Sequence, residues 1–194
     1  PGAVQLLPVR GETVGAQLTG DDRVRGVMFT GSTEVATLLQ RNIASRLDAQ
    51  GRPIPLIAET GGMNAMIVDS SALTEQVVVD VLASAFDSAG QRCSALRVLC
   101  LQDEIADHTL KMLRGAMAEC RMGNPGRLTT DIGPVIDSEA KANIERHIQT
   151  MRSKGRPVFQ AVRENSEDAR EWQSGTFVAT TLIELDDFAE LQKE

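Results

Sequence analysis

Cys93 combines a reactive side chain with a setting in which that side chain can meet a substrate. It stands in the short polar run Gly-Gln-Arg-Cys-Ser, between an expected helix and an expected strand. A thiol in such a turn is accessible, and Arg92 together with nearby backbone N–H groups can favour the nucleophilic thiolate. From context alone, a buried structural thiol is the alternative interpretation.

Glu59 is the second residue whose position points to chemistry. It follows the apolar run 56–58 and precedes Thr60 and the glycines Gly61 and Gly62. A carboxylate at the carboxyl end of a strand, beside glycines that let a ligand approach, is where α/β folds place working residues. Taken alone, Glu59 is more simply interpreted as a solvated loop glutamate.

A third candidate is the run Phe-Thr-Gly-Ser-Thr-Glu-Val, which contains Gly31 and Ser32. A strand that ends in small polar residues and opens a helix presents N–H groups to an anion, typically a pyrophosphate. Because many strand-to-helix turns share this feature, the run carries weight only in combination with the other two.

Other catalytic signatures are missing from the sequence. His108 and His147 are isolated on expected helices, without the spacing of a zinc site, so no metal is predicted. Cys100 and Cys120 fall in an expected strand and on an expected helix face, where cysteine usually acts as a small buried hydrophobe. There is no P-loop, no G-x-S-x-G elbow and no G-x-G-x-x-G fingerprint.

Apolar patterning predicts the elements that must position these residues. Strands are expected at 4–7, 24–29, 56–58, 65–68, 96–101 and 177–185. Helices are expected at 12–18, from 32 or 33 to about 50, from 70–74 to about 90, at 105–122 and at 138–154. The stretches 123–137 and 163–175 are expected to be exposed connections. Alternating strands and helices predict an α/β fold with parallel pairing.

Composition limits the classes of function. The 194 residues carry a formal net charge of −7, which argues against a general nucleic-acid or anionic-membrane binder. No apolar run approaches the roughly 20 residues that span a bilayer. Three cysteines without a C-x-x-C pair fit a reducing cytoplasm better than a disulfide scaffold.

Taken in order, the three motifs resemble the aldehyde dehydrogenase superfamily. In that family the Phe-Thr-Gly-Ser-Thr-Glu-Val motif holds the dinucleotide pyrophosphate, Glu-Thr-Gly-Gly carries the general base, and Gly-Gln-Arg-Cys carries the nucleophile. The separation of Glu59 from Cys93 is also similar to the family's. The stretches 46–62 and 85–97 are similar to the L-glutamate-γ-semialdehyde (pyrroline-5-carboxylate) dehydrogenase part of bacterial proline utilization A enzymes, and Thr60 fits that branch.

The resemblance implies a fold, a reaction and a set of site residues. It implies part of an NAD-binding domain at 1–60 and part of a catalytic domain at 61–194. The implied reaction is NAD-dependent oxidation of L-glutamate γ-semialdehyde to L-glutamate through a cysteine thiohemiacetal and thioester. The implied roles are nucleophile for Cys93, general base for Glu59, pyrophosphate contact for Gly31 and Ser32, nicotinamide contact for Thr60 and Gly61, and substrate-carboxylate contact for Ser94.

The resemblance also implies a wider context. FAD would belong only to the proline dehydrogenase part of the intact parent, which is outside this chain, and the segment alone would be inactive. The parent is expected to be a cytoplasmic homo-oligomer, with peripheral attachment to the inner membrane as an open alternative. Two other classes stay open from the residues: a cysteine acyl transferase or thioester hydrolase, and a non-catalytic module.

Overall fold

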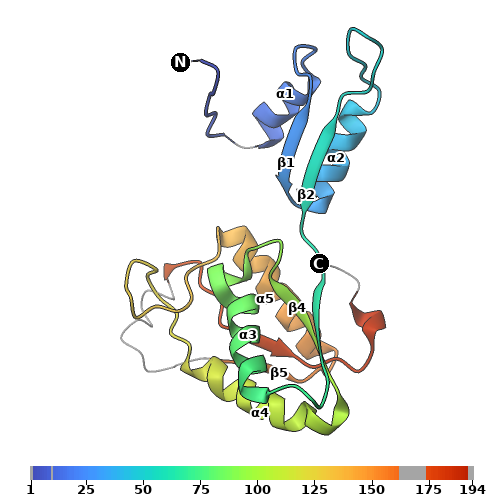
Figure 1. The fold of residues 1–194 in the computed structure, drawn as a ribbon. Coiled ribbons are helices and arrows are strands. Elements are labelled where there is room, and N and C mark those ends of the chain that lie inside the picture. Colours follow the sequence, from blue (N-terminus) through green and yellow to red (C-terminus); the bar gives the residue numbers. More distant parts are fainter. Residues whose placement is uncertain (1, 10, 162–173, 192–194) are drawn as a thin grey trace. The chain divides into compact units, whose positions relative to one another are not determined.

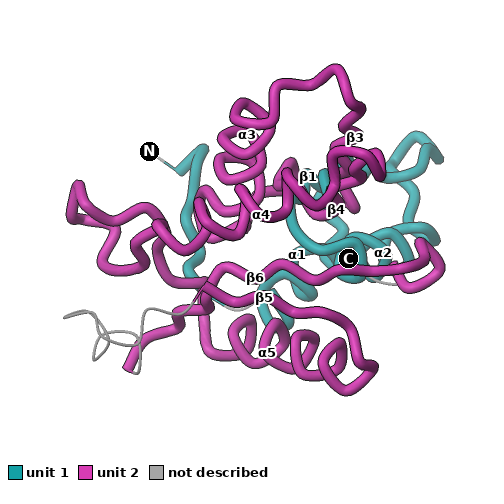
Figure 2. The backbone as a smooth tube through the Cα atoms, turned by 90° about the horizontal axis from the view of Figure 1, so that it is seen from below, with its two compact units in different colours: residues 1–61 teal, residues 62–194 magenta. Residues whose placement is uncertain are grey.

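The computed structural model describes residues 2–9, 11–161 and 174–191. The chain divides into two compact units, Pro1–Gly61 and Gly62–Glu194, coloured separately in Figure 2. Among the described residues, the first unit has one two-stranded sheet and the second unit has two, and each unit has its own helices.

The first unit is built on two parallel strands, β1 (Val27–Gly31) and β2 (Leu56–Thr60). Helix α2 (Thr33–Ile43) leaves β1 and lies along the strand pair (Figure 1). A crossover that contains a helix is the usual connection between parallel strands. Ala36 and Ile43 on α2 are buried, whereas Met28 and Ile57 on the strands are exposed.

Hydrogen bonds from Arg46 hold the amino-terminal part of this unit against the segment that follows α2. A π-helical turn, Gly11–Gly15, continues into the short helix α1 (Ala16–Gly20). The Arg46 guanidinium, from the loop after α2, donates to the backbone oxygens of Thr19, of Asp21 at 2.7 Å and of Val24 at 3.2 Å. The planar fork of arginine thus ties the loop after α1 to the segment after α2.

The second unit has the larger core. Strands β3 (Asn64–Val68) and β4 (Leu96–Leu101) pair in parallel, and helix α3 (Thr74–Phe86) connects them. Helix α4 (Asp103–Glu119) follows β4 and packs against α3. The buried cluster consists of Val68, Val77, Val78, Val81, Leu96, Leu113 and Met117. Leu96 anchors the start of β4 in this cluster, directly after the segment that carries Cys93.

The rest of the second unit combines one helix with a short antiparallel pair. Helix α5 (Ser138–Ser153) begins at Asp137, whose carboxylate accepts from the Ala140 N–H at 2.8 Å. Strands β5 (Val158–Gln160) and β6 (Thr181–Ile183) pair antiparallel. Two 3-10 turns, η2 (Asp87–Gly90) and η3 (Phe188–Glu190), complete the described elements.

The α/β fold predicted from the sequence is confirmed, and the β1–β2 and β3–β4 pairs are parallel as expected. The β5–β6 pair departs from parallel pairing, and β5 was not predicted. The strand expected at 177–185 is limited to Thr181–Ile183. Much of the stretch 163–175, expected to be an exposed connection, lies outside the described residues.

Three further predictions about helices and strands were wrong, one on the existence of a strand and two on where a helix ends. Residues 4–7 form no strand and are exposed, because no described strand pairs with them. The helix expected to reach about 50 ends at Ile43, since the Asp48 side chain accepts from the Gln50 and Arg52 N–H groups and forms a competing loop. Helix α4 ends at Glu119, so Cys120 is its C-cap and does not lie on a helix face. Within the described ranges, no helix is long and apolar enough to cross a membrane.

Candidate active site

The turn between β1 and α2 is shaped by interactions close in sequence. Ser32 is the N-cap of α2, and its Oγ accepts from the Val35 N–H at 3.2 Å. At Gly31, a Cβ atom would lie 2.5 Å from Cζ of the Phe29 ring, so a larger residue displaces that ring. Gly31 and Ser32 are exposed. The first N–H groups of a helix have no partner inside the helix, and the helix dipole is positive at this end. An anion can therefore bind at this turn.

The carboxyl end of β2 lies beside this turn. The parallel register places Thr30 opposite Glu59 and Gly31 opposite Thr60. Glu59 is exposed, and Thr60 and the following Gly61 are half-buried. The carboxyl ends of parallel strands are where α/β sheets bind ligands. The first unit therefore brings the predicted general base and the predicted cofactor contacts to one edge of its strand pair.

Cys93 follows a strained stretch of backbone. Ser88, Ala89 and Gly90 have φ values of 55°, 53° and 68° in the left-handed region. For a residue with a Cβ this conformation costs roughly 1–2 kcal/mol. A Cβ at Gly90 would lie 2.7 Å from the Ala85 carbonyl oxygen, and Arg97 Nη2 donates to the Gly90 carbonyl at 2.8 Å. Strain of this kind persists only where the surroundings hold it, and it concentrates at functional sites.

Gln91 ties the strained turn to a segment far along the chain. Its Nε2 donates to the carbonyls of Ser88 at 3.0 Å and Pro134 at 3.4 Å, and its Oε1 accepts from the Ile136 N–H at 2.7 Å. Arg92, considered above for favouring the thiolate, donates its Nε–H to Ser88 Oγ at 3.1 Å. That part of its guanidinium is therefore engaged with a hydroxyl of the same turn.

Asn64 is a residue near Cys93 that the sequence did not identify. Its Nδ2 donates to the backbone oxygens of Cys93 at 2.8 Å and Ala95 at 2.9 Å. Asn64 is half-buried and opens β3, two residues after Gly62. The available signal was an asparagine, a residue that strands disfavour, at the head of an apolar strand.

The three cysteines differ in exposure. Cys93 is exposed in its turn, whereas Cys100 in β4 and Cys120 at the end of α4 are half-buried. Cys120 Sγ lies 3.5 Å from the Ala116 carbonyl oxygen. Ser94, the predicted substrate contact, is exposed next to Cys93. The interpretation of Cys93 as a buried structural thiol is therefore wrong.

The predicted site residues fall into two groups. Gly31, Ser32, Glu59, Thr60 and Gly61 belong to the first unit, and Cys93 and Ser94 belong to the second. Within each unit the residues of a group lie close together, at the edge of one strand pair or in one turn. His108 and His147 are exposed on helices, and among the described residues no His, Cys, Asp and Glu side chains are grouped to hold a metal.

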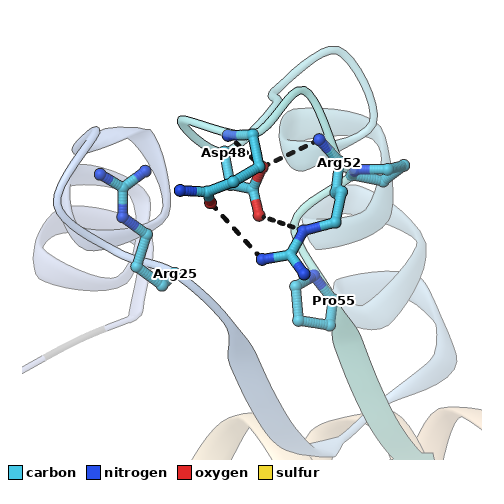
Figure 3. A pocket seen from close by; sticks show the side chains of 6 residues that line it. Arg25, Asp48, Arg52 and Pro55 are labelled. Atoms are coloured by element: carbon cyan, nitrogen blue, oxygen red, sulfur yellow. Dashed lines mark hydrogen bonds and ion pairs between the residues drawn. The ribbon is translucent and has the colours of Figure 1, made fainter.

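The first unit also has a hollow of about 520 Å³, away from the predicted site residues (Figure 3). It is lined by Arg25, Asp48, Gln50, Arg52, Pro53 and Pro55. Asp48 Oδ2 lies 2.8 Å from Arg52 Nε, and the backbone N–H groups of Arg52 and Gln50 also donate to this carboxylate. The pKa of Asp48 is lowered, with the Arg52 backbone N–H as the leading cause. The hollow includes none of the predicted site residues, and its bonds stabilise the loop.

Comparison with known proteins shows to which protein family the chain belongs. The model of the aldehyde dehydrogenase family matches residues 1–194. The chain therefore belongs to the aldehyde dehydrogenase family, as its three motifs indicated.

Within this family, the chain is most usefully compared with three individual proteins. The chain is 98% identical over 194 residues to the bifunctional protein PutA of Escherichia coli, and it spans 15% of that protein. It is 56% identical over 193 residues to the PutA of Rhizobium meliloti, also spanning 15% of it. A 1-pyrroline-5-carboxylate dehydrogenase of Bacillus cereus is 30% identical over the whole chain, which covers 36% of that relative.

Solved structures agree with the fold. A crystal structure of a Bradyrhizobium japonicum proline utilization A mutant superposes with a TM-score of 0.82 at 43% identity, covering 94% of this chain and 18% of that one. A Staphylococcus aureus betaine aldehyde dehydrogenase, solved in complex with NAD+ and with a BME-modified cysteine, superposes with a TM-score of 0.83 at 28% identity. This superposition covers 95% of the chain and 36% of the neighbour.

Proposed function

We propose that this chain supplies the nucleophile and the general base of an NAD-dependent dehydrogenase that oxidises L-glutamate γ-semialdehyde to L-glutamate in proline catabolism. The observation that carries the proposal is the exposed Cys93 on a strained turn that hydrogen bonds hold in place. The 98% identity to PutA and the 30% identity to a 1-pyrroline-5-carboxylate dehydrogenase support the substrate.

Cys93 performs the first half of the proposed reaction. Its thiolate adds to the aldehyde carbon, which forms a C–S bond and a tetrahedral oxyanion. The Cys93 backbone N–H stabilises that oxyanion, and one such donor contributes roughly 3–4 kcal/mol in the transition state. When bound, NAD supplies the acceptor for the hydride that the tetrahedral carbon loses, and Cys93 then holds the acyl group as a thioester.

Glu59 performs the second half. Its carboxylate takes a proton from a water molecule, and the resulting hydroxide adds to the thioester carbonyl. The C–S bond then breaks, Cys93 leaves as a thiolate, and the γ-carboxylate of glutamate is released. Ser94, exposed beside the nucleophile, contacts the carboxylate at the other end of the substrate and so aligns the aldehyde with Cys93.

The first unit supplies the residues that bind the dinucleotide in this proposal. Gly31 and Ser32 meet the pyrophosphate at the amino end of α2, where an exposed turn and a helix dipole fit an anion. Thr60 and Gly61, at the neighbouring end of β2, lie near the nicotinamide. Residues 1–60 accordingly form part of an NAD-binding domain, and residues 61–194 part of a catalytic domain.

The longer protein provides the rest of the proposed context. It is a cytoplasmic homo-oligomer in which FAD serves a separate proline dehydrogenase activity. Because the chain spans 15% of its PutA relatives, we expect no turnover from residues 1–194 alone. An assay of aldehyde-dependent NADH formation by the isolated chain tests this expectation, and normal turnover would contradict it.

The proposed function is tested with two substitutions in the full-length PutA-type protein. Cys93→Ser is expected to abolish aldehyde-dependent NADH formation. Glu59→Gln is expected to leave a single burst of NADH per site, with the acyl group found on Cys93 by mass spectrometry. Cys100→Ser and Cys120→Ser are the controls and should retain turnover. Wild-type turnover by Cys93→Ser would overturn the assignment.

A further inference from the structure

We propose that Asn64 is a positioning residue for the nucleophile, because it holds the peptide carbonyl of Cys93 itself. The proposal rests on the proposed function for the role of Cys93, but its geometric basis is independent of that function. The Asn64 amide nitrogen lies 2.8 Å from the Cys93 oxygen and 2.9 Å from the Ala95 oxygen.

Both distances are those of well-formed N–H···O bonds. A primary amide has two N–H donors, and Asn64 uses one on each carbonyl. The two accepting carbonyls lie on either side of Ser94, so one side chain fixes the backbone of the nucleophile and of the predicted substrate contact. No other residue type of this length offers two donors and no charge.

The strand pairing explains why a side chain is needed at this place. Asn64 pairs with Leu96, but regular pairing resumes at Ala65 with Val98, so the register shifts between Asn64 and Ala65. Irregular pairing of this kind re-aims side chains and is frequent next to active sites. The side-chain amide of Asn64 bonds to residues 93 and 95, just before this irregular start of the ladder, and so extends the contact between the two segments.

The surroundings of Cys93 explain why packing cannot do the same work. Ala95 is buried, with 2% of its surface exposed, and is thereby fixed in the core. Cys93 is exposed and follows the strained residues Ser88 and Ala89. Hydrogen bonds therefore have to hold the nucleophile, and Asn64 joins it to the buried end of the turn.

The expected consequence is a loss of chemical rate without a loss of binding. A displacement of about 1 Å at a reacting atom can reduce the rate about 100-fold. Asn64 contacts the backbone of Cys93, and we assign it no contact with substrate or cofactor. Its removal should lower kcat, while KM for the aldehyde and for NAD change little.

The experiment compares Asn64→Ala, Asn64→Asp and the control Asn143→Ala in the full-length PutA-type protein. Asn64→Ala removes both donors, and Asn64→Asp keeps the size but turns an acceptor oxygen toward the two carbonyls. Asn143 is an exposed asparagine on α5 whose oxygen accepts from Arg146 at 2.9 Å. We expect both Asn64 variants to lose about 10- to 100-fold in kcat, with KM within about threefold. The control should match the wild type.

Alkylation of the cysteines separates positioning from general loosening. A small, freely diffusing reagent such as iodoacetamide does not need an aimed thiol, so Cys93 should remain the preferentially labelled cysteine in the Asn64 variants. An unchanged kcat in both variants would overturn the proposal. So would a lower kcat with Cys100 and Cys120 labelled as fast as Cys93, because that pattern indicates loss of the fold. Cys93→Ser, with Asn64 intact, tests the proposed function separately.

Discussion

The two turns that carry the candidate residues are built in different ways. In the β1–α2 turn, Ser32 has an ordinary φ of −73° and caps its own helix. In the turn before Cys93, Ser88 and Ala89 are left-handed, and Gln91 and Asn64 supply bonds to segments more than 25 residues away. The first turn depends on neighbours in the sequence, whereas the second depends on the surrounding fold. Substitutions in the second should therefore affect activity more than substitutions in the first.

Among substitutions outside the predicted site residues, the largest effect is expected for Gly90→Ala. Gly90 has a φ of 68°, and an added Cβ would lie 2.7 Å from the Ala85 carbonyl oxygen. This oxygen belongs to the backbone of α3, so it cannot move away as a flexible side chain could without disturbing the end of that helix. We expect kcat of the full-length protein to fall at least about 100-fold as the Cys93 turn is displaced. Steady-state NADH formation, with circular dichroism as a check of folding, measures the effect.

Gly155→Ala is the matched control for this substitution. Gly155 has a φ of 77°, but nothing lies within 4 Å of the position of its Cβ. It follows α5 and lies outside the Cys93 turn. Its replacement should cost about 1–2 kcal/mol of stability from the left-handed conformation and leave kcat unchanged. Equal losses of activity in both variants would show that strain alone, without the clash, explains the result.

A smaller effect is expected for Gln91→Ala. The variant loses the bonds to Ser88, Pro134 and Ile136, but water can replace them because Gln91 is exposed. We expect the turn to relax and kcat to fall about 10-fold, with little change in the melting temperature. Gln76→Ala, which removes an exposed bond to Asp80 at 2.8 Å on α3, is the control. A melting temperature that falls in proportion to kcat would contradict a positioning role.

The contrast between local and distant interactions also explains what the sequence could predict. Gly31 and Ser32 were located because a strand pattern, a cap residue and a helix pattern follow one another directly. The Cys93 turn was located because Gly90 was expected to stop a helix and the apolar run 96–101 to form a strand. The strand is confirmed, whereas α3 ends earlier, at Phe86, and the 3-10 turn η2 continues to Gly90. Whether these residues have the roles implied by the resemblance stays a prediction.

The residues that hold the Cys93 turn could not be predicted in the same way. Asn64 and Gln91 act on partners that the fold brings near, and a single polar residue leaves no periodic pattern. The early end of α2 has a different, local origin, because the Asp48 side chain bonds to the backbone of its own loop. The helix propensity of residues 44–50 favoured a longer α2, but the hydrogen bonds of the Asp48 side chain stabilise a loop instead.

A change in the local turn should sharpen the comparison. Ser32→Ala removes the bond to the Val35 N–H and should cost about 1 kcal/mol of stability. Because Ser32 is also proposed to meet the pyrophosphate, KM for NAD should rise several-fold while kcat stays close to the wild-type value. Asp137→Ala removes the equivalent cap of α5 and should lose similar stability without a change in KM. Equal KM values for the two variants would remove Ser32 from the cofactor site.

The smallest effect is expected at Asp48, in a loop outside both turns. Its pKa is lowered in the folded state, so its contribution to stability is present above the unfolded pKa of about 4 and is lost as the pH falls through the folded-state value. Asp48→Asn removes the charge that the Arg52 and Gln50 N–H groups stabilise. The variant should therefore melt below the wild type near neutral pH, and the difference should narrow below about pH 4. Thermal melts from pH 3 to 7 test this, and a difference that is independent of pH would contradict the charge-based explanation. Neither kcat nor KM should change, because no predicted site residue lies in this loop.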